Sequence, residues 1–342
     1  MTNFEGLDVH LEPKLSGSAS RHKHAILRFI LDYPQQHTLV PQFLIDSGLT
    51  MTNYTDHSNA LGQSQSPDYS DSNLIAALEA FIAEIGRRYD GDRRIGFIQV
   101  GLLGFWGEWH TFPHDWIPAS TKDTIVSAFD AAFDQTQVQL RVPWPSAISL
   151  ERPFGLHDDS FAYSTLDGTA NGGDNVPWFF WPSVVAAGAD TVWRTGAMGG
   201  ELRPELQAEV FNDDYLAGTP FKQDFTECTE ITHATYMLNH YAFSTGYTGS
   251  ALQRAVAASD RMGYAFIVSA VTVSQPNSEA VSSVAVVVTQ KGVAAFYYPL
   301  TLSLSCPGTH IRTADGVEAI IAEGDSTTFE FSLPARLGCL EQ

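Results

Sequence analysis

The feature that most constrains the fold is an apolar segment that runs straight into glycines, with the sequence IGFIQVGLLGFWGEWH at positions 95–110. Its beginning, 95–100, lacks the alternation of a half-exposed strand, and this pattern is typical of a strand covered on both faces in a parallel sheet. The glycines that follow permit close approach of the backbone and dihedral angles that other residues avoid. The segment therefore predicts a buried strand that presents Glu108, flanked by indoles, at its far end.

Strand-like and helix-like segments alternate from residue 24 to residue 262, which is the signature of a parallel α/β architecture. Ser72 is expected to cap the first clear helix, and Ser120 with Asp123 the second. The predicted strands lie at 24–31, 95–100, 138–142, 154–161 and 191–198, and the predicted helices at 72–89, from 120, near 183, 206–215, 231–238 and 250–262. Positions 233–238 could instead end a strand.

The alternation favours a (β/α)8 TIM-like barrel, since a barrel of about 250 residues would fit within positions 1–262. Only about six or seven strands are recognisable, and the opening segment is polar, so the first barrel strand can be missing. After Gly263 the pattern changes to strands alone, at 264–273, 281–289, 296–305, 317–322 and 327–333. We therefore expect a barrel domain over 1–262 and a small antiparallel β-sandwich over 263–342. Apart from Tyr297 and Tyr298, this predicted sandwich has few candidate exposed aromatic residues, which favours a structural role for the sandwich over carbohydrate binding.

Composition narrows the partners and the compartment. Asp and Glu total 39 against 19 Lys and Arg, and the net charge of −20 would repel nucleic acid and anionic membranes. No stretch reaches the roughly 18 apolar residues of a membrane span. Acidity suits an extracellular or cell-surface setting, which we favour although the first twenty residues carry no signal peptide. A disulfide between Cys306 and Cys339 and a set of reduced thiols stay equally open.

Two carboxylates stand out as candidate catalytic groups. Glu108 and Glu201 each follow glycine at the end of a predicted strand, and the carboxyl ends of barrel strands line one mouth. Glycoside hydrolysis needs such a pair, because one group protonates the leaving oxygen while the other attacks the anomeric carbon or activates water. We assign Glu108 as general acid/base, since apolar walls raise a carboxyl pKa, and Glu201 as nucleophile or second carboxylate. A helix-start carboxylate of no catalytic use is the alternative for Glu201.

Other polar and aromatic side chains are expected to position a substrate. Aromatic faces pack on sugar rings, and arginines within apolar strands need carboxylate partners. The expected substrate-binding set is Arg28, Trp106, Trp109, His110, Arg141, Trp144, His157 and Asp159. The chemistry requires no cofactor, and because no HExxH or CxxC motif occurs, we expect no metal.

Four blocks of sequence carry a family resemblance: LRF at 27–29, GLLGFWGEWH at 101–110, GGE at 199–201 and GVAAFYYPL at 292–300. From about residue 24 to 333 the chain resembles a family, catalogued as domains of unknown function, that joins a glycosidase-like barrel to a C-terminal β-sandwich. The resemblance implies a barrel related to glycoside hydrolases, with Glu108 and Glu201 at the motif carboxylates. Two features depart from it: family members begin with a further strand, and classical retaining barrels place Asn where Gly107 stands.

The leading hypothesis from sequence is a glycoside hydrolase-like protein that acts on a carbohydrate or glycoconjugate through paired carboxylates. The alternative is a non-catalytic glycan-binding or cell-surface protein that keeps the scaffold without turnover. Sequence leaves the sugar, the linkage and the choice between retention and inversion open.

Overall fold

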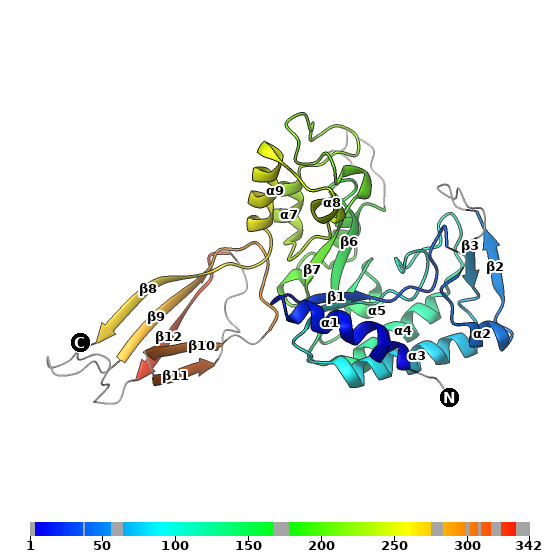
Figure 1. The fold of residues 1–342 in the computed structure, drawn as a ribbon, viewed down its shortest axis with the longest axis horizontal. Coiled ribbons are helices and arrows are strands. Elements are labelled where there is room, and N and C mark those ends of the chain that lie inside the picture. Colours follow the sequence, from blue (N-terminus) through cyan, green and yellow to red (C-terminus); the bar gives the residue numbers. More distant parts are fainter. Residues whose placement is uncertain are drawn as a thin grey trace.

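The computed structural model describes residues 4–36, 38–55, 64–166, 178–274, 283–298, 301–306, 309–315 and 323–332. A helical part with a parallel sheet comes first, and an elongated antiparallel part follows it (Figure 1). Within the described residues, no helix combines the length and the apolar character that crossing a membrane requires.

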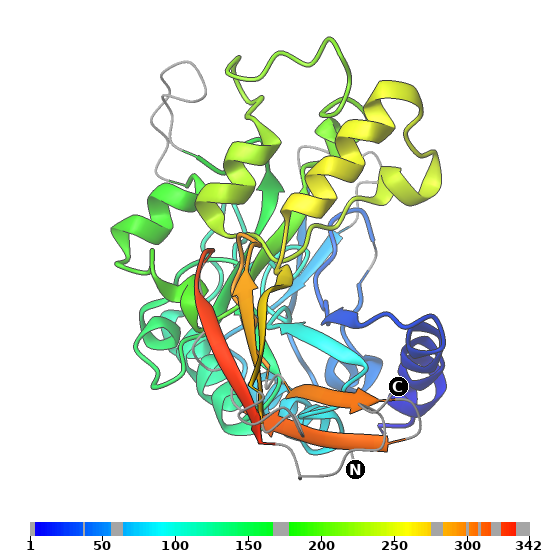
Figure 2. The same ribbon diagram turned by 90° about the vertical axis from the view of Figure 1, so that its left-hand side faces the viewer.

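A curled sheet of parallel strands organises the first part, and its order β1-β4-β5-β6-β7 follows the chain. The strands are β1 (Ala25–Arg28), β4 (Ile95–Gln99), β5 (Gln137–Leu140), β6 (Gly155–Phe161) and β7 (Met198–Leu202). Each strand pairs in parallel with the one before it, so all five carboxyl ends lie at one edge. The sheet forms half of a barrel, and a full (β/α)8 closure is not present among the described residues (Figures 1 and 2).

A segment beyond β7 continues this sheet. The backbone N–H groups of Thr235 and Leu238 donate to the carbonyls of Met198 and Gly200, both over 2.8 Å. The helix before it, α7 (Phe225–Thr232), ends at His233 in a left-handed conformation with φ of 53°. The helix predicted over 231–238 is therefore wrong, and its alternative as strand-like backbone is the better description.

The long helices follow the predicted pattern but begin differently. The helix α3 (Ser72–Tyr89) is capped by Asp71, whose side chain accepts hydrogen bonds from the backbone of Asn73 and Leu74, and not by Ser72. The helix α4 (Ala119–Ala132) starts after Pro118 without a capping side chain. The remaining helices are α1 (Glu12–Ala19), preceded by a π-helical turn (Leu7–Leu11), α2 (Gln42–Asp46), α5 (Pro145–Ile148), α6 (Phe180–Ala186), α8 (His240–Ser244) and α9 (Gly249–Arg261).

Two further predictions fail because close packing replaces regular structure. Residues 191–198 were expected to form a strand, but Val192–Arg194 is a 3-10 turn whose buried Trp193 stacks on His233 at 3.6 Å. Pairing starts only at Met198, so Glu201 lies within β7 and not after its strand. The helix expected over 206–215 is absent, since only Pro204–Leu206 forms a short 3-10 turn and the residues beyond it form turns.

The C-terminal part contains antiparallel sheets. One sheet consists of three strands, β8 (Phe266–Ser274), β9 (Ser283–Gln290) and β12 (Ser326–Ser332). A second sheet pairs β10 (Thr301–Cys306) with β11 (Thr309–Asp315). A further antiparallel pair, β2 (Met51–Tyr54) with β3 (Ser64–Pro67), belongs to the first part of the molecule. Leu302 and Leu304 pack against a small core that includes Val286 and Phe331. The predicted strand at 317–322 and the pairing of Cys306 with Cys339 fall outside the described residues and side chains.

The connector 291–298 fixes the C-terminal part to the amino ends of the parallel strands. Val293, Ala294 and Ala295 are buried. The hydroxyl of Tyr297 donates to the carbonyl of Trp193 over 2.9 Å, and that of Tyr298 donates to the carbonyl of Gly96 in β4. These tyrosines were expected on the surface of a sandwich, but they are half-buried and close the bottom of the sheet.

Candidate functional site

Charged side chains gather where the parallel strands end. We call them the carboxylate cluster: Arg28, Glu108, Arg141, His157, Asp158, Asp159 and Glu201. Arg28 ends β1, Arg141 follows β5, the acidic pair lies in β6 and Glu201 lies in β7. Parallel pairing brings residues from distant parts of the chain to one edge, which is where ligand groups collect in such sheets.

The ion pair between Arg28 and Asp159 is the best-connected contact of the cluster. Nη2 of Arg28 lies 2.9 Å from Oδ1 and 2.8 Å from Oδ2 of Asp159, and its Nε donates to Gln99 over 2.6 Å. Burial alone would raise the pKa of Asp159, but its hydrogen-bond contact with His157 and the charge of Arg28 hold it well below its usual value. Asp159 therefore stays negatively charged inside the cluster.

His157 is buried beside this ion pair, with its side chain 1% exposed. Its Nδ1 lies 3.0 Å from Oδ1 of Asp159 and 3.2 Å from Nη2 of Arg28. Burial lowers the pKa of His157; the charge of Asp159 opposes this effect, and the guanidinium groups of Arg28 and Arg141 add to it. The ring is therefore neutral at physiological pH and serves to orient the carboxylate rather than to carry a charge.

Arg141 faces three carboxylates without closing a hydrogen bond to any of them. Its Nε lies 3.8 Å from both Glu108 and Asp159, and its Nη2 lies 3.7 Å from Asp158. That Nε atom is buried and has no hydrogen-bond partner in the part of the chain that the structure describes. A shift of less than about 1 Å would complete a charge-assisted hydrogen bond to one of these carboxylates.

Glu108 sits on the glycine-rich loop after β4, and the loop is held by a buried acid. The backbone N–H of Trp106 donates to the carbonyl of Asp32 over 2.8 Å, and the N–H of Gly104 donates to the hydroxyl of Tyr69 over 2.9 Å. Gly101 has φ of +55°, and a side chain there would meet the carbonyl of Phe29 at 2.4 Å. Only glycine fits this turn.

The acid beneath the loop, Asp32, is fully buried and well bonded. It accepts hydrogen bonds from Ser66 over 2.5 Å and from Tyr54 over 2.6 Å. Burial raises the pKa of Asp32 in spite of these bonds. On the loop above it, the Glu108 carboxylate is 18% exposed and its Oε2 lies 3.5 Å from Nε2 of His110.

Glu201 carries the most informative electrostatic shift. Burial raises its pKa from 4.5 to about 7, and the charges of Asp159 and Glu108 add to the rise while Arg28 opposes it. The cause is therefore a carboxyl group that is partly withdrawn from water and surrounded by like charge. A carboxyl with this pKa holds a proton near neutrality and can donate it.

The predicted aromatic positions lie around the cluster to different degrees. Trp106 is half-buried, and its ring lies 6.2 Å from that of His110. Trp109 is 2% exposed, and its indole N–H donates to the carbonyl of Gly101, so it packs in the core. Trp144 donates to Asp123 of α4 over 2.7 Å. The structure thus brings Arg28, His110, Arg141, His157 and Asp159 together with Glu108 and Glu201, and it gives Trp109 and Trp144 other partners.

A polar network beneath the cluster was missed by sequence reasoning. The hydroxyl of Tyr236 accepts from Gln99 over 2.8 Å and donates to Gln139 over 2.6 Å. A side chain at Gly199 would lie 2.3 Å from the Tyr236 ring, so this glycine makes room for it. Glutamines inside the apolar segments of β4 and β5 were the available signal, whereas nothing local marked Tyr236.

Comparisons with known proteins add no assignment: no family model matches the chain, and no curated protein matches it. No group of three or more His, Cys, Asp and Glu side chains in the described ranges is arranged to hold a metal ion.

Proposed function

We propose that the chain is a glycoside hydrolase that acts through Glu201 and Glu108. The observation that supports this most directly is the convergence of these carboxylates, from β7 and from the loop after β4, at the same edge of the sheet. They are near enough that the charge of Glu108 contributes to the raised pKa of Glu201. Paired carboxyl groups in unlike environments are the arrangement that acid-assisted glycoside cleavage requires.

We assign Glu201 as the proton donor, which exchanges the roles expected from the sequence. Glu108 was expected to be the acid because indoles flank it, but Trp109 turns into the core and Glu108 faces the guanidinium of Arg141 at 3.8 Å. We therefore assign Glu108 as the nucleophile or base. Glu201, with its pKa of about 7, suits the acid.

In the proposed reaction, Glu201 transfers its proton to the glycosidic oxygen while the bond from that oxygen to the anomeric carbon breaks. Glu108 either attacks the anomeric carbon, to give a glycosyl ester that water then hydrolyses, or removes a proton from the water that attacks directly. In the first case Glu201 takes a proton from that water and returns to its starting state. A carboxyl separation of about 5–5.5 Å fits the first course, and about 6.5–9.5 Å fits the second.

The family resemblance supports the same proposal, because its most specific block, WGEWH, contains Glu108. We also propose that the half-barrel is related to a (β/α)8 barrel and that the C-terminal sheets form a β-sandwich. The parallel order of successive strands and the packing of β10 side chains against β9 and β12 support these relationships.

The alternative proposal is a glycan-binding protein without turnover. The half-barrel favours it, since five strands leave the described sheet open where a complete barrel would place further groups around the reacting sugar.

Assay of the chain against a panel of neutral 4-nitrophenyl glycosides and their unactivated disaccharide counterparts tests the proposal. We expect Glu108→Gln to abolish turnover on both kinds of substrate, and Glu201→Gln to impair the disaccharides far more, because 4-nitrophenolate leaves without a proton. Glu205→Gln is the matched control, since Glu205 is exposed and paired with Arg203. If both the Glu108→Gln and the Glu201→Gln variant turn over substrate at the wild-type rate, the assignment is refuted. If the wild type binds a glycoside saturably but does not cleave it, the glycan-binding alternative is favoured.

A further inference from the structure

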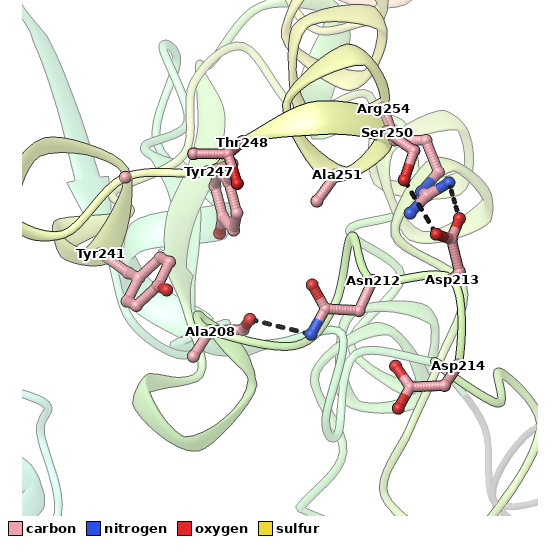
Figure 3. A pocket seen from close by; sticks show the side chains of 11 residues that line it. Ala208, Asn212, Asp213, Asp214, Tyr241, Tyr247, Thr248, Ser250, Ala251 and Arg254 are labelled. Carbon is pink, nitrogen blue, oxygen red and sulfur yellow. Dashed lines mark hydrogen bonds and ion pairs between the residues drawn. The ribbon is translucent and has the colours of Figure 1, made fainter.

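A pocket lies away from the carboxylate cluster, among α8, α9 and the loop 208–214 (Figure 3). Its volume is about 390 Å³, within the range of small-molecule sites. No member of the carboxylate cluster lines it. The pocket therefore offers a separate place for a ligand.

Two tyrosines form one wall of this pocket and are held in place from behind. The rings of Tyr241 and Tyr247 lie 5.2 Å apart at 51°. The hydroxyl of Tyr247 donates to the carbonyl of Gln207 and accepts from Asn239 over 2.9 Å. The buried side chain of Gln207 accepts from the backbone N–H of Tyr241 over 3.0 Å. The aromatic wall is thus ordered before any ligand binds.

The lining of the pocket also supplies polar groups that remain available. Asp213 is already occupied, because Arg254 donates to it over 2.6 Å and Ser250 over 2.8 Å. Asp214 has no hydrogen-bond or ion-pair partner among the residues that the structure describes, and neither do the hydroxyls of Tyr241 and Thr248.

Asn212 completes the polar side. Its amide nitrogen donates to the carbonyl of Ala208 over 3.3 Å, and its side chain faces the same space as the two tyrosine rings (Figure 3). The pocket therefore combines an aromatic wall with hydroxyl, amide and carboxylate groups.

This combination selects the chemistry of a ligand. A pyranose ring presents an apolar C–H face to an aromatic wall and hydroxyl groups to the polar side, where donors and acceptors both occur. An anionic ligand is disfavoured, because Arg254 is already paired with Asp213, Asp214 adds a further negative charge to the lining, and the chain carries a net charge of −20. We propose that this pocket is a carbohydrate-binding site for one neutral sugar unit, and it stands independently of the hydrolysis proposed for the cluster.

The test is a titration of the full chain with maltotriose, cellotriose, mannotriose and triacetylchitotriose, followed by saturation-transfer NMR and calorimetry. We expect at least one trisaccharide to bind, and Tyr241→Ala to weaken that binding by about tenfold or more, as for loss of a central contact. Phe243→Ala is the matched control, since Phe243 lies on the same helix, is 91% exposed and does not line the pocket.

Two further variants keep the result decisive. Asn212→Ala removes a polar contact from an exposed loop and should weaken binding even if Tyr241→Ala unfolds, which thermal unfolding would reveal. Glu108→Gln should leave binding at this pocket unchanged, whether or not it alters turnover. The proposal is overturned if no trisaccharide binds, if the pocket variants bind as the wild type does, or if only Glu108→Gln reduces binding.

Discussion

The two ends of the parallel sheet are built from different chemistry. The amino end is covered by the connector 291–298, whose alanines are buried and whose tyrosine hydroxyls satisfy backbone carbonyls. The carboxyl end holds buried or half-buried charges, including Arg28, Asp159 and Glu201. Burying charge is unfavourable even when it is paired, whereas burying apolar groups stabilises the fold. The amino end therefore contributes to the stability of the fold, whereas the carboxyl end is where we propose that the chemistry takes place.

The largest expected effect is on turnover at the carboxyl end. Glu201→Gln removes the proposed proton donor without changing the shape of the side chain. We expect the rate on unactivated glycosides to fall by about 10²–10⁴-fold, the usual contribution of general acid catalysis, with little loss of stability. Steady-state kinetics of Glu201→Gln beside the Glu205→Gln control measures this. An unchanged rate in Glu201→Gln would contradict the proposal that the carboxyl end of the sheet carries the chemistry.

The next effect is on stability at the same end. Arg28→Met leaves Asp159 buried without its closest cation, which should lower the free energy of unfolding by about 3–5 kcal/mol. Arg87→Met on the surface of α3 is the control, because its partner Glu84 is also bound by Arg88 and its own side chain is 68% exposed. Urea unfolding should show a larger loss in the free energy of unfolding for Arg28→Met than for Arg87→Met. Equal losses would mean that the ion pair between Arg28 and Asp159 contributes no more to stability than a surface ion pair.

A smaller effect concerns pH. The pKa of Glu201 is raised from 4.5 to about 7 on folding, so the native state binds more protons than the unfolded state between these values. The resulting destabilisation is absent below about pH 4.5, grows as pH rises and is complete above about pH 7. Glu201→Gln should remove it, gaining on the order of 1–2 kcal/mol relative to wild type at pH 8 after allowance for solvent screening. Unfolding curves of the wild type and of Glu201→Gln at pH 5 and pH 8 test this. If the difference between their free energies of unfolding is the same at both pH values, the raised pKa of Glu201 is contradicted.

The smallest effect belongs to the amino end. Tyr297→Phe removes one hydrogen bond to the carbonyl of Trp193 and leaves the ring in place. We expect a loss of about 1 kcal/mol in stability and no change in turnover or in the pH dependence above. A measurable change in kcat would show that the two ends of the sheet are coupled and would contradict the separation of their roles.

Local sequence patterns were enough to predict those helices and strands whose apolar residues recur with a clear period. The strand over 95–100 and the helix over 72–89 were predicted because their apolar spacing is set by their own burial, and both are confirmed as β4 and α3. Glu108 and Glu201 were chosen because each follows a glycine-marked strand. The start of β7 at Met198 was missed, since it depends on how Trp193 and Gly196 pack against distant residues.

The parts that sequence reasoning missed are those made by long-range contacts. The bond between Gln99 and Tyr236 joins residues 137 positions apart, and the bond between Tyr298 and Gly96 joins residues 202 positions apart. No local spacing encodes either of them. The exchange of roles that we propose for Glu108 and Glu201 has the same origin, because Arg141 and Asp159 reach the two carboxylates only through the fold.

The most direct test of the central claim is the pKa of Glu201, measured from the carboxyl carbon shift of ¹³C-labelled protein as pH is varied and assigned with Glu201→Gln. We expect a pKa of about 7 in the wild type and a lower pKa in Glu108→Gln, because the charge of Glu108 contributes to the rise. An ordinary value near 4.5 that does not respond to Glu108→Gln would contradict the paired-carboxylate site.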